Sequence, residues 1–180
     1  MNIINTDFND AYLIEPDVFG DARGWFMETY TKKKIEEATK VEFIQDNQSY
    51  SAKKGVIRGL HFQNNPMAQT KLIRCTRGRI YDVIVDLRKS SSTYLKWIKV
   101  ELSEENKRQL LIPKGFAHGF VTLTDDVEVQ YKVDEYYSKE CDRSIRWNDP
   151  LFGINWEIEN PQLSEKDQKA PLYKDSDVSF

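Results

Sequence analysis

Histidine is the side chain best suited to exchange a proton near neutral pH, and this chain has only two, His61 and His118. His61 lies in the stretch GVIRGLHFQ, residues 55–63, three positions after Arg58 and among residues typical of a buried strand. A histidine in such a strand can be a packed core residue, a metal ligand or a general base. The other polar residues of the chain bear on this choice.

Metal-ligand spacing is missing around both histidines. Neither an H-x-H nor an H-x-x-x-H pattern occurs, so a transition-metal site would have to recruit carboxylates in place of further imidazoles. The sequence therefore disfavours a metal site. These residues alone leave a core histidine and a general base open.

A histidine that removes a proton from carbon needs other groups around the substrate. An adjacent carbonyl must acidify the carbon, a cation must hold the enolate oxygen, and an acid must return the proton. Lys71 in QTKLIRC could supply the cation and Tyr131 in VEVQYKV the acid. Each also has an ordinary structural role, because most strand lysines are solvated and buried tyrosines pack as aromatics. Arg23 and Arg58 each precede a glycine, and their guanidinium groups suit a phosphate as well as a structural ion pair.

The composition is that of one water-soluble domain. The 180 residues are 39% hydrophobic and 31% charged, with a formal net charge of −3. This charge excludes a strongly cationic surface, so we do not expect nucleic acid as a partner. No stretch approaches the roughly 18 apolar residues of a membrane span. The N-terminus has no leader pattern, and two cysteines, Cys75 and Cys141, are too few for a disulfide framework, so we expect a cytoplasmic protein with free thiols.

Short runs of alternating apolar and polar residues predict a chain made mainly of strands. A helical pattern is confined to TKKKIEEATK, residues 31–40, with Thr31 as its N-cap. Many short strands with closely spaced turns favour a single antiparallel jelly-roll barrel over residues 1–180. Strands are predicted over 56–63, 71–75, 79–88, 96–102, 127–133 and on both sides of the Pro113–Gly115 break within 108–123.

The alternation also predicts which side chains share a strand face. Tyr131 lies on the same side as the valines of its strand, which points its hydroxyl into the barrel. His61 and Arg58 lie on opposite sides of a strictly alternating strand. If both contact one ligand, the strand must bulge near Gly59.

Eight longer segments of the chain can be compared with the motifs of known protein families. They are FGDARGWFMETY (19–30), QDNQSYS (45–51), GVIRGLHFQ (55–63), AQTKLIRCTRGRIYDVIVDLRKSSSTY (68–94), LSEENKRQLLIPKGFAHGFVTL (102–123), YKVDEYY (131–137), IRWNDP (145–150) and LSEKDQ (163–168). In this order, the eight segments resemble the dTDP-4-dehydrorhamnose 3,5-epimerase family of nucleotide-sugar epimerases. The resemblance covers most of the chain.

The resemblance implies a cupin-like jelly-roll barrel of antiparallel strands with a few short helices. It implies a homodimer that exchanges an N-terminal segment between subunits and uses neither a metal nor an organic cofactor. The expected substrate is dTDP-4-dehydro-6-deoxy-D-glucose, epimerised at C3 and C5 to dTDP-4-dehydro-L-rhamnose. Three alternatives are a relative that inverts only one of these carbons, a relative that binds nucleotide sugars without catalysis, and a metal-dependent cupin.

The functional residues of the family match defined positions of this chain. His61 matches the proton-abstracting base, and Asp167 the carboxylate that hydrogen-bonds it. Tyr131 matches the proton donor, and Lys71 the residue beside the C4 keto oxygen. One departure is Asp142, which stands where the family usually has a glutamate that contacts the nucleotide. The resemblance assigns substrate contacts, some in the neighbouring subunit, to Arg23, Glu28, Gln45, Asp46, Asn47, Arg58, His118, Tyr137, Asp142 and Lys166.

Overall fold

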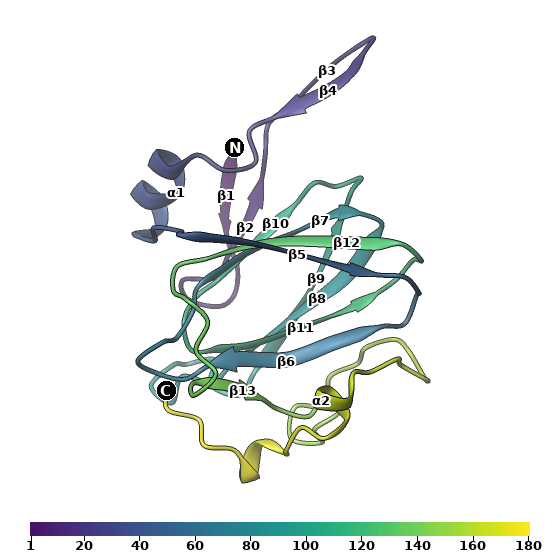
Figure 1. Ribbon diagram of the computed structural model, residues 1–180. Helices are drawn as coiled ribbons and strands as arrows, with labels where there is room; N and C mark the ends of the chain where they lie inside the picture. Colours follow the sequence, from purple (N-terminus) through teal and green to yellow (C-terminus); the bar gives the residue numbers. More distant parts are fainter.

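The computed structural model describes residues 1–180, which form two antiparallel sheets packed face to face (Figure 1). The upper sheet has six strands in the order β1-β2-β10-β7-β12-β5, and the lower sheet has five in the order β13-β6-β11-β8-β9. Strands β3 and β4 form a separate hairpin. This arrangement confirms the predicted all-β, antiparallel jelly roll.

The chain contains thirteen strands, two α-helices and one 3₁₀ helix. The strands are β1 (Asn2–Asn5), β2 (Tyr12–Glu15), β3 (Val18–Asp21), β4 (Gly24–Met27), β5 (Gln45–Ser51), β6 (Ile57–Gln63), β7 (Lys71–Arg77), β8 (Arg79–Asp86), β9 (Trp97–Ser103), β10 (Gln109–Ile112), β11 (Phe116–Thr122), β12 (Val127–Val133) and β13 (Asp142–Ser144). The helices are α1 (Lys32–Thr39), α2 (Glu165–Gln168) and η1 (Tyr173–Asp175). None of these helices has the length and apolar character needed to cross a membrane.

Most of the longer strands lie where residue alternation predicts them, but alternation does not predict β5, whose seven residues are almost all polar. Strand β12 has the predicted bounds, and Pro113–Gly115 separates β10 from β11 as expected. Helix α1 follows Thr31, but the Thr31 hydroxyl donates to the Glu28 carboxylate and caps no backbone N–H. Alternation does not predict β1 to β4, β13 or α2, because runs of three or four residues are too short to show a period.

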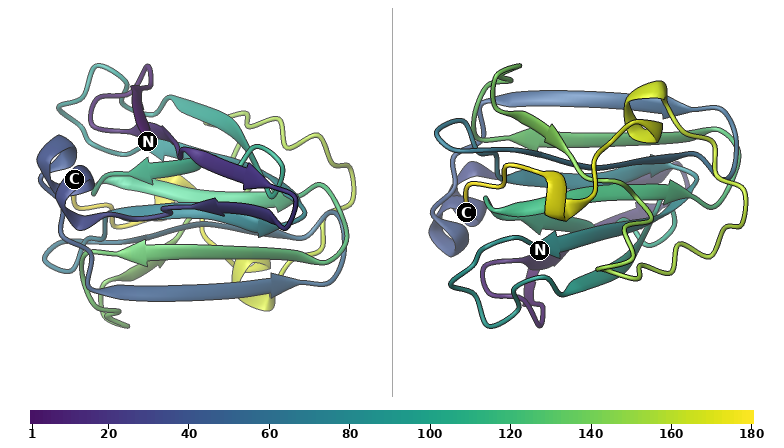
Figure 2. Two further views of the ribbon diagram at one scale, coloured as in Figure 1. Left: turned by 90° about the horizontal axis from the view of Figure 1, so that it is seen from above. Right: turned by 90° about the horizontal axis from the view of Figure 1, so that it is seen from below.

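Apolar side chains cover both faces of the lower sheet. Between the two sheets, Ile73, Ile84 and Phe120 belong to one buried cluster to which both sheets contribute. On the outer face of the lower sheet, Val83 and Val85 pack against the C-terminal segment. The path of this segment across the sheet is visible in Figure 2. Burial on both faces explains why β8 is apolar along most of its length. The same packing fixes the C-terminal segment against the sheet that contains β6.

Strand β6 bulges at Gly59, where the backbone of β11 approaches closely. Two residues separate Arg58 from His61, whereas one residue separates their partners on β11. Gly59 has a φ of 137°, and a Cβ there would lie 2.5 Å from the Cα of Gly119. Only glycine fits this position. The bulge brings Arg58 and His61 to the same cavity, so the irregularity predicted for a shared site is confirmed.

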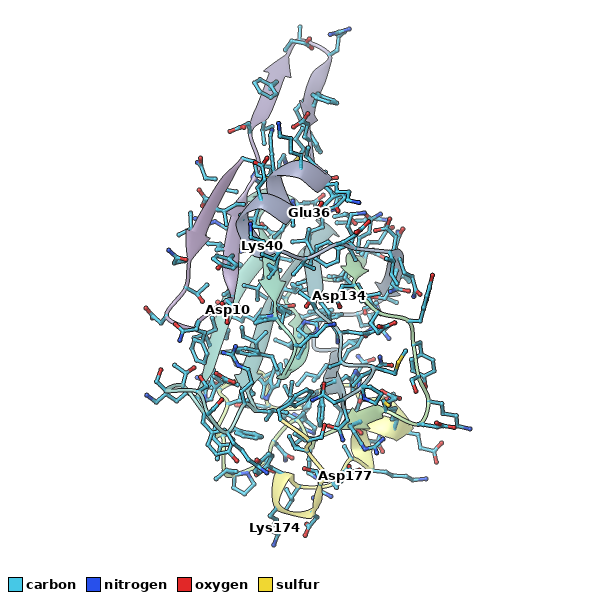
Figure 3. All side chains as sticks on the ribbon, turned by 90° about the vertical axis from the view of Figure 1, so that its left-hand side faces the viewer. Asp10, Glu36, Lys40, Asp134, Lys174 and Asp177 are labelled. Carbon is cyan, nitrogen blue, oxygen red and sulfur yellow. The ribbon has the colours of Figure 1, made fainter.

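The β3–β4 hairpin projects from the body of the molecule (Figure 1). Figure 3 shows its side chains standing clear of the sheets, at the opposite end from Lys174 and Asp177 of the C-terminal segment. Its aromatic residues Phe19, Trp25 and Phe26 are 63%, 58% and 66% exposed. Exposed aromatic side chains gathered on one projecting element are typical of a surface that binds a partner.

A methyl group added at Gly119 should disturb the bulge. A Cβ at this position would lie 2.8 Å from the carbonyl oxygen of Arg58 and 3.1 Å from the Cα of Gly59, so the backbone would have to move. We expect Gly119→Ala to lower the free energy of unfolding by about 1–3 kcal/mol, the usual range for overpacking. Urea denaturation followed by circular dichroism measures this change. Gly20→Ala is the control, because its Cβ would meet nothing closer than 3.7 Å, and equal losses in the two variants would contradict the close packing.

Candidate active site

A cavity of about 460 Å³ opens between the two sheets. Strands β5, β7 and β12 of the upper sheet, β6 and β11 of the lower sheet, and the segment leading into α2 contribute its walls. A cavity of this size with a few polar groups is typical of a small-ligand site. Its polar lining residues are Ser49, Arg58, His61, Lys71, His118, Tyr131, Gln162, Ser164 and Asp167.

His61 and Asp167 form a hydrogen-bonded pair in the wall of this cavity. Atom Nε2 of His61 donates to Oδ1 of Asp167 at 2.5 Å, and Nδ1 has no partner in the protein. The Asp167 side chain is 2% exposed and that of His61 is 31% exposed. Burial would raise the pKa of Asp167, but the hydrogen bond and charge of His61, with a hydrogen bond from Ser164, hold that pKa below its usual value. The ionised carboxylate therefore orients the imidazole and leaves Nδ1 free to accept a proton.

The position of Asp167 depends on the start of α2. The N-cap Ser164 hydroxyl accepts from the Asp167 N–H at 3.1 Å and donates to Oδ2 of the same residue at 2.9 Å. Backbone bonds tie the preceding segment to β6, with the Gln162 N–H donating to Gly55 at 2.8 Å and the Ile57 N–H donating to Gln162 at 3.0 Å. These contacts place a carboxylate beside a histidine that lies 106 residues earlier in the chain.

Lys71 and Tyr131 come from the upper sheet, which faces β6 across the cavity. Neither the Lys71 ammonium nor the Tyr131 hydroxyl is hydrogen-bonded to the protein. Burial lowers the pKa of Lys71 to about 8, against the opposing charges of Asp82 and Asp142. Burial raises the pKa of Tyr131, and the nearby Arg58 guanidinium limits that rise. Near neutral pH the cavity thus contains a free phenol and a free ammonium group.

A second histidine–carboxylate pair faces the same cavity. Nε2 of His118 donates to Oδ2 of Asp82 at 2.8 Å, and both side chains are buried. Burial lowers the pKa of His118; Asp82 opposes this effect, while Lys71 and His61 add to it. Asp82 is not among the residues predicted for the site, although an acid between the inward-facing isoleucines of β8 is a signal in the sequence. No three His, Cys, Asp or Glu side chains lie close enough together to hold a metal ion.

Further polar groups surround the catalytic candidates. Arg58 donates two hydrogen bonds to β5, at 2.8 and 3.2 Å, which hold its guanidinium in the cavity wall. Asp142 accepts hydrogen bonds from Lys166 at 2.5 Å and from the Tyr137 hydroxyl at 3.3 Å. The Tyr137 ring is 62% exposed. Since Asp142 and Lys166 both act on the pKa of Lys71, this charged cluster lies near the cavity.

The three predicted contacts on β5 lie outside the lining of this cavity. The Gln45 side-chain amide donates to Oδ1 of Asn47 at 2.9 Å. Asp46 is paired with Lys132 at 2.7 Å, and both Asp46 and Asn47 line a second hollow beside the sheet. Gln45 and Asn47 alternate with Asp46 along β5, so Gln45 and Asn47 share one face of the strand.

Arg23 and Glu28 also lie away from the cavity within one chain. Arg23, in the turn of the β3–β4 hairpin, is paired with Asp21 at 2.6 Å and its side chain is 90% exposed. Glu28 follows β4 and is paired with Lys34 at 2.8 Å. The hairpin therefore presents these groups to its surroundings and not to the cavity of its own chain.

Comparison with known proteins places the chain in a family. The family model described as dTDP-4-dehydrorhamnose 3,5-epimerase matches residues 5–175. A relative of that name from Shigella flexneri is 53% identical over 179 residues, which cover 98% of this chain and 98% of the relative. The similarity therefore extends over nearly the whole of both chains.

Solved structures give the same result. This chain is similar to a dTDP-4-dehydrorhamnose 3,5-epimerase from Bacillus anthracis with TDP and PPi bound, with 56% identity, a TM-score of 0.93 and coverage of 95% of this chain and 98% of that chain. It is also similar to a dTDP-6-deoxy-D-glucose-3,5-epimerase from Legionella pneumophila in complex with dTDP-4-keto-L-rhamnose, with 45% identity, a TM-score of 0.93 and coverage of 98% and 94%. With sequence, fold and family model in agreement, this chain belongs to the dTDP-4-dehydrorhamnose 3,5-epimerase family.

Proposed function

We propose that this chain epimerises dTDP-4-dehydro-6-deoxy-D-glucose at C3 and C5, giving dTDP-4-dehydro-L-rhamnose. One observation carries the proposal: His61, Lys71 and Tyr131 line one cavity, and their Nδ1, Nζ and Oη atoms are not bonded to other protein groups. A free base, cation and acid suit a keto sugar whose neighbouring C–H bonds must be broken and remade. Relatives that carry this name, one of them bound to dTDP-4-keto-L-rhamnose, support the same substrate.

The first step breaks a C–H bond next to the 4-keto group. His61 takes the proton on Nδ1, and the electron pair of the broken bond moves through the carbonyl to its oxygen, forming an enolate. Asp167 stabilises the imidazolium that results. Lys71 stabilises the negative charge on the enolate oxygen.

The second step returns a proton to the opposite face of the sugar. Tyr131 belongs to the upper sheet and His61 to the lower sheet, so they approach a ring held between the sheets from different sides. Proton transfer from the Tyr131 hydroxyl inverts the carbon and leaves a tyrosinate, while His61 retains the proton that it removed. Proton exchange of both groups with solvent resets the site for the second carbon. The raised pKa of Tyr131 keeps its hydroxyl protonated before each transfer.

Loss of the base and loss of the acid should affect proton exchange differently. In deuterated water, His61→Ala should abolish deuterium incorporation into the sugar, because no group remains to break the C–H bond. Tyr131→Phe should still incorporate deuterium but invert slowly, because the enolate forms and is reprotonated by His61 from the original face. NMR of the sugar follows both processes, and Tyr136→Phe, a change at an exposed tyrosine outside the cavity lining, is the control. Deuterium incorporation at the full rate by His61→Ala would contradict the proposal.

The labelled positions also separate the double epimerase from its alternatives. With the unmodified protein in deuterated water, we expect deuterium at both C3 and C5, because each inversion replaces one hydrogen. Label at only one carbon would assign the chain to the epimerases that invert a single centre. Binding of the nucleotide sugar without any label would identify a non-catalytic binding protein.

The charged groups around the cavity suit the nucleotide part of the substrate. Arg58, fixed by its bonds to β5, has the charge and donor geometry to bind the diphosphate. The exposed ring of Tyr137 is available to stack on the base, and the Lys166–Asp142 pair provides further polar contacts. His118 adds a polar contact from the cavity wall.

We place the active protein as a homodimer in which the hairpin of one subunit completes the cavity of the other. The exposed aromatic residues of the projecting hairpin support this arrangement, because a second copy would remove their surface from water. Arg23, which meets only Asp21 within its own chain, could then reach a substrate diphosphate. The two cysteines are free, which suits the reducing environment of the cytoplasm.

Mixed dimers test this exchange of segments. In the proposed dimer, Arg23→Ala impairs the site of the neighbouring subunit, whereas His61→Ala disables the site of its own. A heterodimer of the two variants then has one site with both defects and one intact site, so random assembly on co-expression should restore about a quarter of the wild-type sites. If Arg23 served its own subunit, every site would carry a defect. Activity no higher than that of the separate variants would therefore contradict the exchange.

A further inference from the structure

Asp82 is the one buried group of the site with an incomplete set of partners. Its side chain is 0% exposed and lies within the cluster of apolar residues between the sheets. Oδ2 accepts the hydrogen bond from His118, but Oδ1 is the only buried side-chain nitrogen or oxygen in the structure without a hydrogen-bond partner. A buried carboxylate is unfavourable unless nearby groups compensate its charge. Its retention in an apolar strand therefore requires an explanation.

One cavity residue, His118, is hydrogen-bonded to this carboxylate, and a second, Lys71, acts on its charge from the other sheet. His118 lies on β11, the neighbouring strand of the lower sheet, and Lys71 lies on β7 of the upper sheet. Both side chains line the cavity, whereas Asp82 does not. Asp82 is the leading charged influence on both Lys71 and His118. The other titratable groups that act on these two residues are Asp142 of β13, Lys166 next to it, and His61 of β6.

The other charged groups are paired among themselves. Asp142 and Lys166 form an ion pair at 2.5 Å and act on the pKa of Lys71 in opposite directions. His61 is bonded to its own carboxylate, Asp167. Among the carboxylates, Asp82 therefore has the largest effect on the pKa of Lys71.

We propose that Asp82 is a positioning residue of the epimerase site: its carboxylate fixes the proton of a neutral His118 on Nε2 and serves as the counter-charge that keeps Lys71 cationic. The two residues then meet the developing enolate oxygen in fixed protonation states, with one ammonium donor beside an uncharged imidazole. The proposal rests on the proposed function and deepens it, because it assigns a task to a residue that does not touch the substrate.

The physical reason is that burial disfavours the charged forms of Asp82, Lys71 and His118. Burial lowers the pKa of Lys71 and of His118 and raises that of Asp82, and each opposite charge counteracts this change in its neighbour. One carboxylate can balance one cation. A second cation on His118 would be repelled by the Lys71 ammonium, so the arrangement with a single positive charge is the one that a buried carboxylate favours.

The protonation state of His118 can be read directly from the unmodified protein. Because the chain has only two histidines, the ¹H–¹⁵N spectrum of their imidazoles is simple to assign with His61→Ala. Near neutral pH we expect His118 to be neutral with its proton on Nε2. A doubly protonated ring, or a proton on Nδ1 with Asp82 donating to Nε2, would overturn the proposal. This measurement needs no turnover, so its failure is distinct from failure to epimerise the sugar.

The dependence of kcat/KM on pH tests the effect on Lys71. The wild-type profile should fall on the basic side with a pKa of about 8, as Lys71 loses its proton. In Asp82→Asn the counter-charge is gone, so the same limb should move to lower pH, and kcat near neutral pH should fall by about 100-fold with KM little changed. A basic limb at the wild-type position, with a loss that is uniform across pH, would overturn the proposal.

Asp86→Asn is the matched control. Asp86 lies on the same strand and is also 0% exposed, but it is paired with Arg88 at 2.9 Å and does not line the cavity. Its loss should reduce the thermal stability without moving the basic limb of the pH profile. An equal shift in both variants would show a general effect of removing a buried carboxylate from β8 and would overturn the specific role of Asp82. If Asp82→Asn does not fold, the imidazole spectrum of the wild-type protein still decides the question.

Discussion

The hydrogen bond between His61 and Asp167 joins residues 106 positions apart, and much of the structure serves to make it. His61 reaches the cavity because β6 bulges at Gly59 against the backbone of β11. Asp167 reaches His61 because the C-terminal segment packs across the outer face of the lower sheet and is then tied to β6 by backbone bonds. An imidazole without this carboxylate would have no fixed tautomer and no partner for its positive charge. The jelly roll, the bulge and the C-terminal segment therefore contribute to one chemical group.

The two-sheet fold places polar groups on both sides of the cavity, which the His61–Asp167 pair alone cannot do. In the proposed mechanism, a ring placed between the sheets meets His61 from the lower sheet and the hydroxyl of Tyr131 from the upper sheet, as inversion of a carbon requires. The unpaired Oδ1 atom of Asp82 reduces stability, since an unpaired buried polar group is unfavourable by about 1–3 kcal/mol. The apolar clusters on both faces of the lower sheet offset this loss. The polar groups at the cavity therefore lower the stability of the fold and provide its reactive atoms.

Residue alternation predicts a strand correctly where the strand is long and one face is apolar while the other is polar. It predicts β9, β12 and the need for a bulge at Gly59, whereas β1 to β4 are too short and depend on partners distant in sequence. In the site, only the family resemblance of LSEKDQ connects Asp167 to His61, because no local pattern links the two ends of the chain. Asp82 could not be assigned a role from the sequence, since its role depends on side chains that face it from other strands. Arg23 could be assigned only through the resemblance for the same reason, as its proposed site lies on a second copy of the chain.

If Asp167 makes His61 an effective base, replacing its carboxylate should slow proton removal from the sugar. In Asp167→Asn the amide has the same shape as the carboxylate, so the cavity and its affinity for dTDP should be preserved. The measurement is the rate at which the hydrogens on C3 and C5 of the substrate exchange with deuterated water. We expect this rate to fall by roughly 10³- to 10⁴-fold, because the amide can hold the imidazole in the wrong tautomer and cannot stabilise the imidazolium. An exchange rate within about threefold of the wild-type rate, with dTDP still bound normally, would show that His61 does not depend on Asp167.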